Sequence, residues 1–165
     1  MEMKCCPLYS GSSGNCFFVE YGNTRVLVDV GLSGKMTCDA LNYIHVDPAS
    51  INAILVTHEH SDHCKGVGIM SRKFRLPVYA TRGTWEGMEA ELGKLPDGAR
   101  HVFAADEDFY IGQLGVVPFS VPHDAQDPVG FRLWGGSMSV ATATDLGYFP
   151  RHLEDALAGT DLLLL

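Results

Sequence analysis

The stretch Ala53-Ile54-Leu55-Val56-Thr57-His58-Glu59-His60-Ser61-Asp62-His63 decides how the rest of this 165-residue chain is interpreted. It joins four apolar residues, typical of a strand, to a heptapeptide that holds three of the chain's seven histidines. Imidazole and carboxylate side chains are ligands for zinc and for other divalent cations. Gathering so many of them at one strand end lowers stability unless something binds there. The stretch therefore predicts a metal site.

Length and composition indicate one globular domain spanning residues 1–165. Apolar residues make up 46% of the chain and charged residues 19%, which is ordinary for a soluble protein. The net charge of −8 argues against a basic nucleic-acid-binding face, but it permits an acidic cluster that bound cations neutralise. The five cysteines form no CxxC pair, which favours a reducing compartment. No apolar run approaches the roughly 18 residues that span a bilayer. We expect a cytoplasmic protein without membrane contact.

Apolar periodicity predicts strands interleaved with a few helices, hence a mixed α/β (α+β) fold. Gly22-Asn23 and Gly135-Gly136 predict hairpin turns. Thr81 is placed to cap a helix, and Pro150 suits the first turn of another. The expected strands are residues 3–9, 16–21, 25–30, 53–56, 77–80, 101–103, 109–111, 115–121, 129–134 and 137–142, and the expected helices are residues 38–44, 66–73, 84–92 and 150–157.

The last five residues are Asp161-Leu162-Leu163-Leu164-Leu165, preceded by a turn signal at Gly159-Thr160. Such an apolar run predicts a buried central strand. Chain termini usually lie on the surface, so a terminus inside a core strand is unusual. We therefore expect this sequence to be the front portion of a longer protein, truncated at its C-terminus.

Two later segments carry further ligand-type residues after expected strands. Val121-Pro122-His123-Asp124 follows one of them, and Thr142-Ala143-Thr144-Asp145 follows another. These two loops and the heptapeptide, each at a strand end, could converge on one edge of the fold. The alternative is a solvated polar loop in which the histidines cluster by coincidence.

The order of these residues resembles the metallo-β-lactamase-fold hydrolase superfamily. The resemblance rests on His58-x-His60-x-Asp62-His63, followed by His123 and then Asp145. Val28-Asp29-Val30-Gly31 also resembles the early aspartate-glycine element of that superfamily. The opening Ser10-Gly11-Ser12-Ser13-Gly14-Asn15 and the heptapeptide are most similar to the bacterial YycJ/WalJ-like branch. The resemblance covers essentially the whole chain and implies a four-layer αββα sandwich.

The resemblance further implies two divalent metal ions, with zinc, manganese and iron as the alternatives. The implied ligands are His58, His60 and His123 for the first ion and Asp62 and His63 for the second, with Asp145 bridging both. A further histidine near the family's C-terminal end has no match, because His152 comes too soon. We expect that ligand beyond Leu165.

A pair of metal ions about 3.5–4 Å apart activates water and stabilises charge on an attacked phosphorus or carbonyl. Asp62 is the candidate catalytic residue, which orients the nucleophile and accepts its proton. Asp29 is expected to hydrogen-bond the ligand loop so that its imidazoles keep one tautomer; the alternative is an aspartate that caps a turn. The candidate phosphate-binding loop is Ser10-Gly11-Ser12-Ser13-Gly14-Asn15, through its backbone N–H groups; the alternative is a flexible hairpin loop.

Hydrolysis at a dinuclear metal centre is the activity that the resemblance implies. Phosphodiester cleavage is favoured because the YycJ/WalJ-like branch is associated with DNA exonuclease activity, which makes DNA the expected partner. The chief alternative is a thioester or lactone hydrolase of the glyoxalase II type, which would use the same ligands. A third interpretation is a metal-stabilised binding module without catalysis, supported only by the unmatched last histidine.

Overall fold

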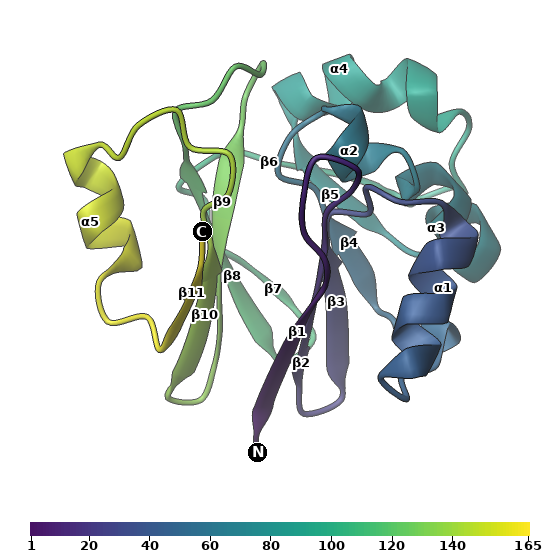
Figure 1. Ribbon diagram of the computed structural model, residues 1–165, viewed down its shortest axis with the longest axis horizontal. Helices are drawn as coiled ribbons and strands as arrows, with labels where there is room; N and C mark the ends of the chain where they lie inside the picture. Colours follow the sequence, from purple (N-terminus) through teal and green to yellow (C-terminus); the bar gives the residue numbers. More distant parts are fainter.

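The computed structural model describes residues 1–165 and contains two β-sheets packed face to face, with helices on both outer sides (Figure 1). The strands are β1 (Met3–Tyr9), β2 (Cys16–Tyr21), β3 (Thr24–Val28), β4 (Ala53–Leu55), β5 (Val78–Thr81), β6 (Arg100–Phe103), β7 (Phe109–Ile111), β8 (Leu114–Ser120), β9 (Val129–Gly135), β10 (Met138–Thr142) and β11 (Leu162–Leu164). The helices are α1 (Gly34–Tyr43), α2 (Ser61–Cys64), α3 (Val67–Phe74), α4 (Arg82–Leu92) and α5 (Arg151–Leu157), with one 3₁₀ turn, η1 (Pro48–Ser50).

The first sheet has the strand order β1-β2-β3-β4-β5-β6, and the second has the order β11-β10-β9-β8-β7. Helices α1, α3 and α4 cover the outer face of the first sheet, and α5 covers the second (Figure 1). The expected αββα sandwich is therefore confirmed. None of the helices is long and apolar enough to cross a lipid bilayer.

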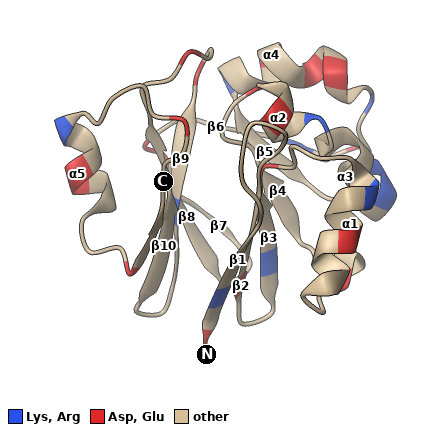
Figure 2. Ribbon diagram, in the orientation of Figure 1, with Lys and Arg blue, Asp and Glu red and all other residues tan.

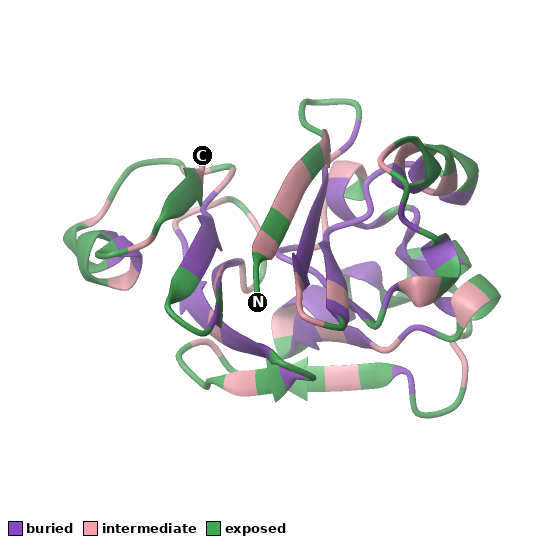
Figure 3. Cartoon of the chain, turned by 90° about the horizontal axis from the view of Figure 1, so that it is seen from below, coloured by how far each residue is buried: buried purple, intermediate pink, exposed green.

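Three hydrophobic clusters fill the three interfaces between the four layers. The largest lies under the helices and includes Leu27, Ile54 and Met70. The second lies between the sheets, where Leu55 of the first sheet meets residues such as Phe131 of the second. The third lies under α5. Because Ile54 and Leu55 face opposite clusters, β4 is apolar throughout, as expected for a strand buried on both sides. Figure 3 shows these buried strands between more exposed outer elements.

The connections explain why loops from distant segments meet at one end. Strands β3, β4, β5 and β6 run parallel, so their carboxyl ends lie at the same edge of the sheet. The turns of the β2–β3 and β9–β10 hairpins lie at the opposite end and place glycines at positive φ, with Gly22 at +58° and Gly136 at +58°. As a result, the residues that follow β3 and β4 lie close together.

Several boundaries differ from the sequence expectation for local reasons. Strand β3 ends at Val28 because Asp29 adopts a left-handed conformation with φ of +62°. Helix α1 begins four residues earlier than expected, because the Ser33 side chain accepts the N–H of Met36 and caps it. The cap at Thr81 is confirmed, since its side chain accepts the N–H of Thr84. Helix α2 and η1 were not expected.

The predicted strand at the end of the chain is confirmed as β11, but its expected burial is wrong. β11 pairs in parallel with β10 only and therefore forms an edge of the second sheet. Leu162 and Leu163 are 49% and 38% exposed. Within residues 1–165 the one neighbour of β11 is β10, so the other side of the strand is uncovered.

Candidate metal centre

The heptapeptide begins as an extended segment and ends in a short helix. His58 follows the buried strand β4 after Val56 and Thr57, and His60 is the residue that precedes α2. Asp62 and His63 then lie in that single helical turn. The turn fits closely against the segment after β3, since a β-carbon at Gly31 would overlap the carbonyl oxygen of Asp62. The chain thus turns a linear run of ligand-type residues into a compact group.

Two other loops bring their residues to the same place. The β8–β9 loop carries His123 and is hydrogen-bonded at its end to the heptapeptide, where Val129 N–H donates to Thr57 O at 3.0 Å. The segment after β10 carries Asp145, which adopts a left-handed conformation with φ of +59°. In Figure 1 both segments lie at the end of the molecule where α2 is found.

The first group of candidate ligands consists of His58, His60 and His123, whose ring nitrogens lie within 4.8 Å of one another. His123 Nε2 is 3.2 Å from His60 Nδ1. Three imidazoles without a carboxylate form a donor set that suits zinc and other borderline cations. The three residues predicted to share the first ion are therefore placed together.

The second group consists of His58, His63 and Asp145, with ligand atoms again within 4.8 Å of one another. Asp145 Oδ2 is 2.8 Å from His63 Nε2, and Asp62 Oδ2 is 3.6 Å from the same nitrogen. Asp62 thus lies next to this group, with its carboxylate farther from His63 Nε2 than the carboxylate of Asp145. All six predicted ligands are gathered in one cluster, and His58 is common to both groups.

The buried Nε2 atom of His58 has no hydrogen-bond partner. His58 is only 2% exposed, and burial, together with the neighbouring imidazoles His63, His123 and His60, lowers its pKa to about 2. The ring is therefore neutral and offers a lone pair. An unpartnered buried acceptor costs about 1–3 kcal/mol, and a divalent cation between the two groups would satisfy it. The residues present thus fit a metal ion.

Thr57 and Asp29 determine which nitrogen of His58 carries the proton. Asp29 Oδ1 accepts the N–H of Thr57 at 2.8 Å, and Asp29 Oδ2 accepts its hydroxyl at 2.7 Å. Because the hydroxyl has donated its only proton, it must accept at 2.9 Å from Nδ1–H of His58. The lone pair of His58 is then on Nε2, facing the cluster. Sequence reasoning assigned no role to Thr57, and its only signal was its position immediately before the first histidine.

Asp29 also orients the second histidine of the cluster. His63 Nδ1 donates to Asp29 Oδ2 at 2.7 Å. Burial lowers the pKa of His63, but the hydrogen bond and charge of Asp29, with the charges of Asp145 and Asp62, raise it above its ordinary value on balance. The position of Asp29 thus matches the expected contact with the ligand loop, because its carboxylate touches both Thr57 and His63.

The loop Ser10-Gly11-Ser12-Ser13-Gly14-Asn15 reaches the cluster through its last residue. Asn15 N–H donates to Asp62 O at 2.8 Å, and Asn15 Nδ2 is 3.3 Å from His63 Nε2. Within the loop, the N–H groups of Gly14 and Gly11 are bonded to Gly11 O and to Asn15 Oδ1. Two of the N–H groups expected to cradle a phosphate therefore serve the loop itself. The direct contact of the Asn15 side chain with the cluster was not expected.

The Glu59 side chain is hydrogen-bonded to the loop that carries His123. Glu59 Oε1 accepts the N–H of Gln126 at 2.8 Å, and its Oε2 is buried without a partner. We expect Glu59→Ala to weaken metal binding about 10- to 100-fold, because a hydrogen bond to a charged group is worth about 1.5–3 kcal/mol. Isothermal titration with Mn²⁺ or Zn²⁺ measures the affinity.

Two variants serve as controls for Glu59→Ala. Glu59→Gln keeps an oxygen that accepts the Gln126 N–H and should bind metal as the native protein does. Glu86→Ala removes a glutamate whose side chain is 57% exposed and should change nothing. Equal metal affinities of Glu59→Ala and Glu59→Gln would show that the hydrogen bond does not hold the His123 loop in place.

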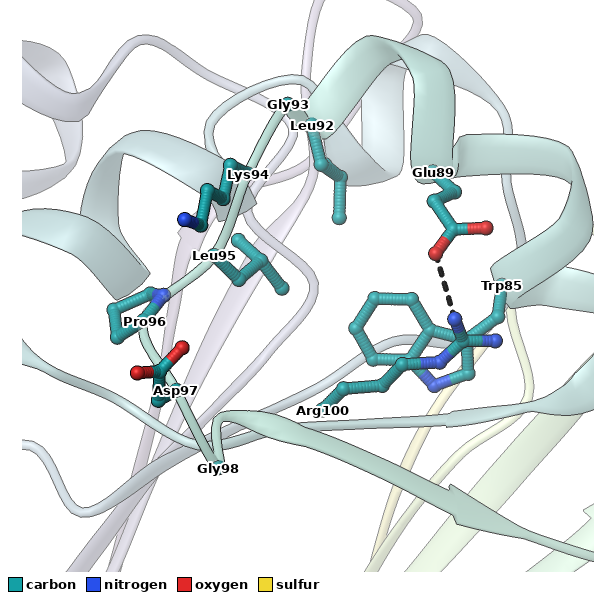
Figure 4. Close-up of a pocket in the computed structure, with 10 residues that line it drawn as sticks. All are labelled: Trp85, Glu89, Leu92, Gly93, Lys94, Leu95, Pro96, Asp97, Gly98 and Arg100. Atoms are coloured by element: carbon teal, nitrogen blue, oxygen red, sulfur yellow. Dashed lines mark hydrogen bonds and ion pairs between the residues drawn. The ribbon is translucent and has the colours of Figure 1, made fainter.

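The largest cavity lies away from this cluster, between α4, the loop after it and β6 (Figure 4). It has a volume of about 530 Å³. The guanidinium of Arg100 lies 5.0 Å over the ring of Trp85 and pairs with Glu89 at 2.6 Å. No residue of the cluster lines this cavity, and the Arg100 guanidinium at its wall is already paired with Glu89. The cluster of ligand-type residues, and not this cavity, is therefore the candidate functional site.

Comparisons with known proteins agree with this arrangement. The model of a family described as "Beta-lactamase superfamily domain" matches residues 24–165. Exodeoxyribonuclease YycJ of Bacillus anthracis is 37% identical over 161 residues, which cover 98% of this chain and 61% of that protein. Exodeoxyribonuclease WalJ of Streptococcus pneumoniae (strain D39) is 40% identical over 158 residues, covering 94% and 57%. The chain thus spans about 60% of the length of these relatives.

A solved structure supports the fold independently. The metallo-β-lactamase fold protein YhfI from Bacillus subtilis aligns with 98% of this chain and 70% of its own, with a TM-score of 0.78 at 17% identity. At such low identity the likeness concerns the fold alone. The family model, in contrast, matches more than half of the chain and includes the heptapeptide and both later ligand loops. The chain therefore belongs to the beta-lactamase superfamily, in its metallo-β-lactamase fold.

Proposed function

We propose that the protein is a metal-dependent hydrolase with a dinuclear centre that cleaves DNA phosphodiesters from a strand end. The observation that carries the proposal is the unpartnered Nε2 of His58, which is common to two ligand groups. The lone pair on this nitrogen can bind one ion, and the two overlapping groups together offer donors for a second. The choice of DNA is supported by the similarity to two proteins named exodeoxyribonucleases.

In this proposal His58, His60 and His123 would hold one ion, Asp62 and His63 would hold the other, and Asp145 would be a ligand that both share. Bound ions would supply Lewis-acid activation of water and neutralise charge on the attacked phosphate.

The protein side chains have separate tasks around the ions. The Asp62 carboxylate is 32% exposed, so water and substrate reach it, and it orients the attacking water and accepts its proton. Asp29 keeps the proton of His63 on Nδ1 and, through Thr57, that of His58 on Nδ1. Both Nε2 atoms would then carry the lone pairs that bind metal.

The acidic balance of the chain favours a second candidate, a thioester or lactone hydrolase. The net charge is −8, and Figure 2 shows acidic residues on α2 and on the β8–β9 loop, near the cluster. A small ester would not meet the repulsion that DNA phosphates meet from these carboxylates. Two divalent ions would add four positive charges at this end of the molecule, which reconciles the acidic surroundings with a phosphodiester substrate.

The test uses the full-length protein with Mn²⁺ or Zn²⁺ and 5′-phosphorylated duplex DNA. We expect the DNA to be shortened, EDTA to stop the reaction, and Asp62→Ala to reduce kcat by about 10²- to 10⁴-fold, as for loss of a general base. Asp39→Ala, a change at an aspartate with a 62% exposed side chain on α1, is the control. Cleavage of S-lactoylglutathione or a lactone with DNA untouched would establish the second candidate. Metal uptake without turnover of any ester would establish the binding module.

A further inference from the structure

The segment between Asp145 and α5 exposes two consecutive aromatic residues beside the candidate metal centre. Tyr148 is 68% exposed and Phe149 is 50% exposed. Three peptide units separate Tyr148 from Asp145, so their Cα atoms are at most about 11 Å apart. A nucleotide whose phosphate lies at the cluster would therefore be close enough for its base to contact these rings.

The backbone around the two rings is held on both sides. Gly147 N–H donates to Pro122 O at 2.7 Å, next to His123 in the sequence. Leu146 packs against the hydrophobic cluster under α5. Pro150 follows directly, and a proline restricts the backbone of the residue before it. The segment that carries the aromatic pair is therefore hydrogen-bonded to the loop of His123, and in the sequence it follows Asp145.

Other aromatic residues that are exposed or half-buried pair with another ring or lie elsewhere in the fold, as Tyr43 does at the last position of α1. Tyr110, which is 64% exposed, packs edge-on against Trp134 with ring centroids 5.6 Å apart. Tyr79 stacks on His101 at 4.5 Å. Tyr148 and Phe149 take part in no aromatic pair of this kind, and the Tyr148 hydroxyl makes no hydrogen bond within the chain. Their π-faces are available to a partner from outside.

The chemistry of the surroundings selects the partner. Exposed aromatic rings bind unpaired nucleobases by stacking, and they do so without requiring a particular base. Acidic residues lie near the cluster (Figure 2), so apart from the phosphate that the ions would bind, uncharged contacts are better suited than phosphate contacts to hold DNA at this end. We propose that Tyr148 and Phe149 stack against the unpaired bases of a single-stranded DNA end and hold the adjacent phosphodiester at the metal centre. This inference rests on the proposed phosphodiesterase function.

The experiment compares two single-stranded, 5′-phosphorylated oligonucleotides that differ only at their terminal nucleotides. One carries normal bases and the other carries abasic sites, so both present the same phosphates. With the Mn²⁺-loaded full-length protein, we expect Tyr148→Ala and Phe149→Ala each to lower kcat/KM about 5- to 150-fold on the normal oligonucleotide. On the abasic oligonucleotide the variants should equal the native protein. Tyr148→Phe should retain the preference for bases.

A binding measurement separates stacking from an effect on chemistry. In the Asp62→Ala background with Mn²⁺, fluorescence anisotropy of a labelled normal oligonucleotide should show a weaker Kd for Tyr148→Ala and Phe149→Ala by a similar factor. Tyr43→Ala is the matched control, because Tyr43 is an 86% exposed tyrosine at the far end of α1. Thermal melts should be equal for all variants, since the rings are on the surface.

The outcomes distinguish the inference from the function on which it rests. If the native protein cleaves DNA but the aromatic variants match it on both oligonucleotides, the stacking role is overturned and the phosphodiesterase function stands. If the native protein cleaves neither oligonucleotide nor the phosphorylated duplex, the proposed function fails and the stacking role fails with it.

Discussion

Replacing His58 with alanine should reduce metal-dependent hydrolysis to the level of the EDTA-treated native protein. His58 is one of the three histidines assigned to the first ion and also lies within the second group, so its loss removes a donor at the centre of the cluster. The same change should remove the thermal stabilisation that added metal gives. An ion at 100 times its Kd stabilises the native state by about 2.7 kcal/mol, and this increment should disappear in the variant. Melting curves with and without Mn²⁺ measure it.

The metal-free protein provides the internal control for His58→Ala. Without metal the variant loses the hydrogen bond from His58 Nδ1 to Thr57, but Nε2 has no partner to lose, so it should remain folded and melt cooperatively. His45→Asn is a matched control, because His45 is an exposed histidine at positive φ, a conformation that asparagine tolerates. Full metal-induced stabilisation of His58→Ala would rule out a ligand role for this residue.

Replacing Asp29 with alanine should lower the free energy of unfolding of the metal-free protein by about 3–5 kcal/mol. The change removes the buried partner of His63 and leaves two donors of Thr57 unpaired. Alanine is also disfavoured at the φ of +62° that Asp29 adopts. Because typical domains are stable by only about 5–15 kcal/mol, the effect should be evident in urea unfolding.

Asp29→Asn separates the backbone effect from the electrostatic effect. Asparagine tolerates the positive φ and keeps one acceptor oxygen, so the loss of stability should be smaller. Its amide no longer carries the charge that holds His63, and metal affinity should still fall about 10- to 100-fold, as for other residues that orient metal-bound histidines. Asp39→Ala is the exposed control for stability. Native metal affinity in Asp29→Asn would show that Asp29 has only a structural role.

Local sequence patterns predicted most of the elements because the physical cause of each is local. The apolar run that became β4 is followed by the histidine motif, and the turns at Gly22 and Gly136 require residues that accept positive φ. The six candidate ligands were identified by residue type and order; the structure gathers five of them in two overlapping groups and places Asp62 3.6 Å from His63 Nε2. Whether each one binds a metal ion stays a prediction.

The contacts that orient the candidate ligands were not predicted, since they join residues far apart in the sequence. Glu59 and Gln126 are separated by 67 positions, and Asn15 and His63 by 48. In the sequence Thr57 resembles an ordinary strand residue, and its role depends on the hydrogen bond that its hydroxyl donates to Asp29. Such roles arise from the pairing of segments, which no local pattern encodes.

The sequence by itself determined the class of fold, the family resemblance and the identity of the candidate ligands, because these follow from periodicity, turn chemistry and motif order. Only the tertiary structure decided that His58 is common to both groups and that β11 pairs in parallel with β10. It also placed the segment that carries the exposed Tyr148 and Phe149 against the loop that carries His123, through the hydrogen bond from Gly147 to Pro122. These features depend on which strands are neighbours and on where loops meet, and the packing of the two sheets, not local residue preference, sets that geometry.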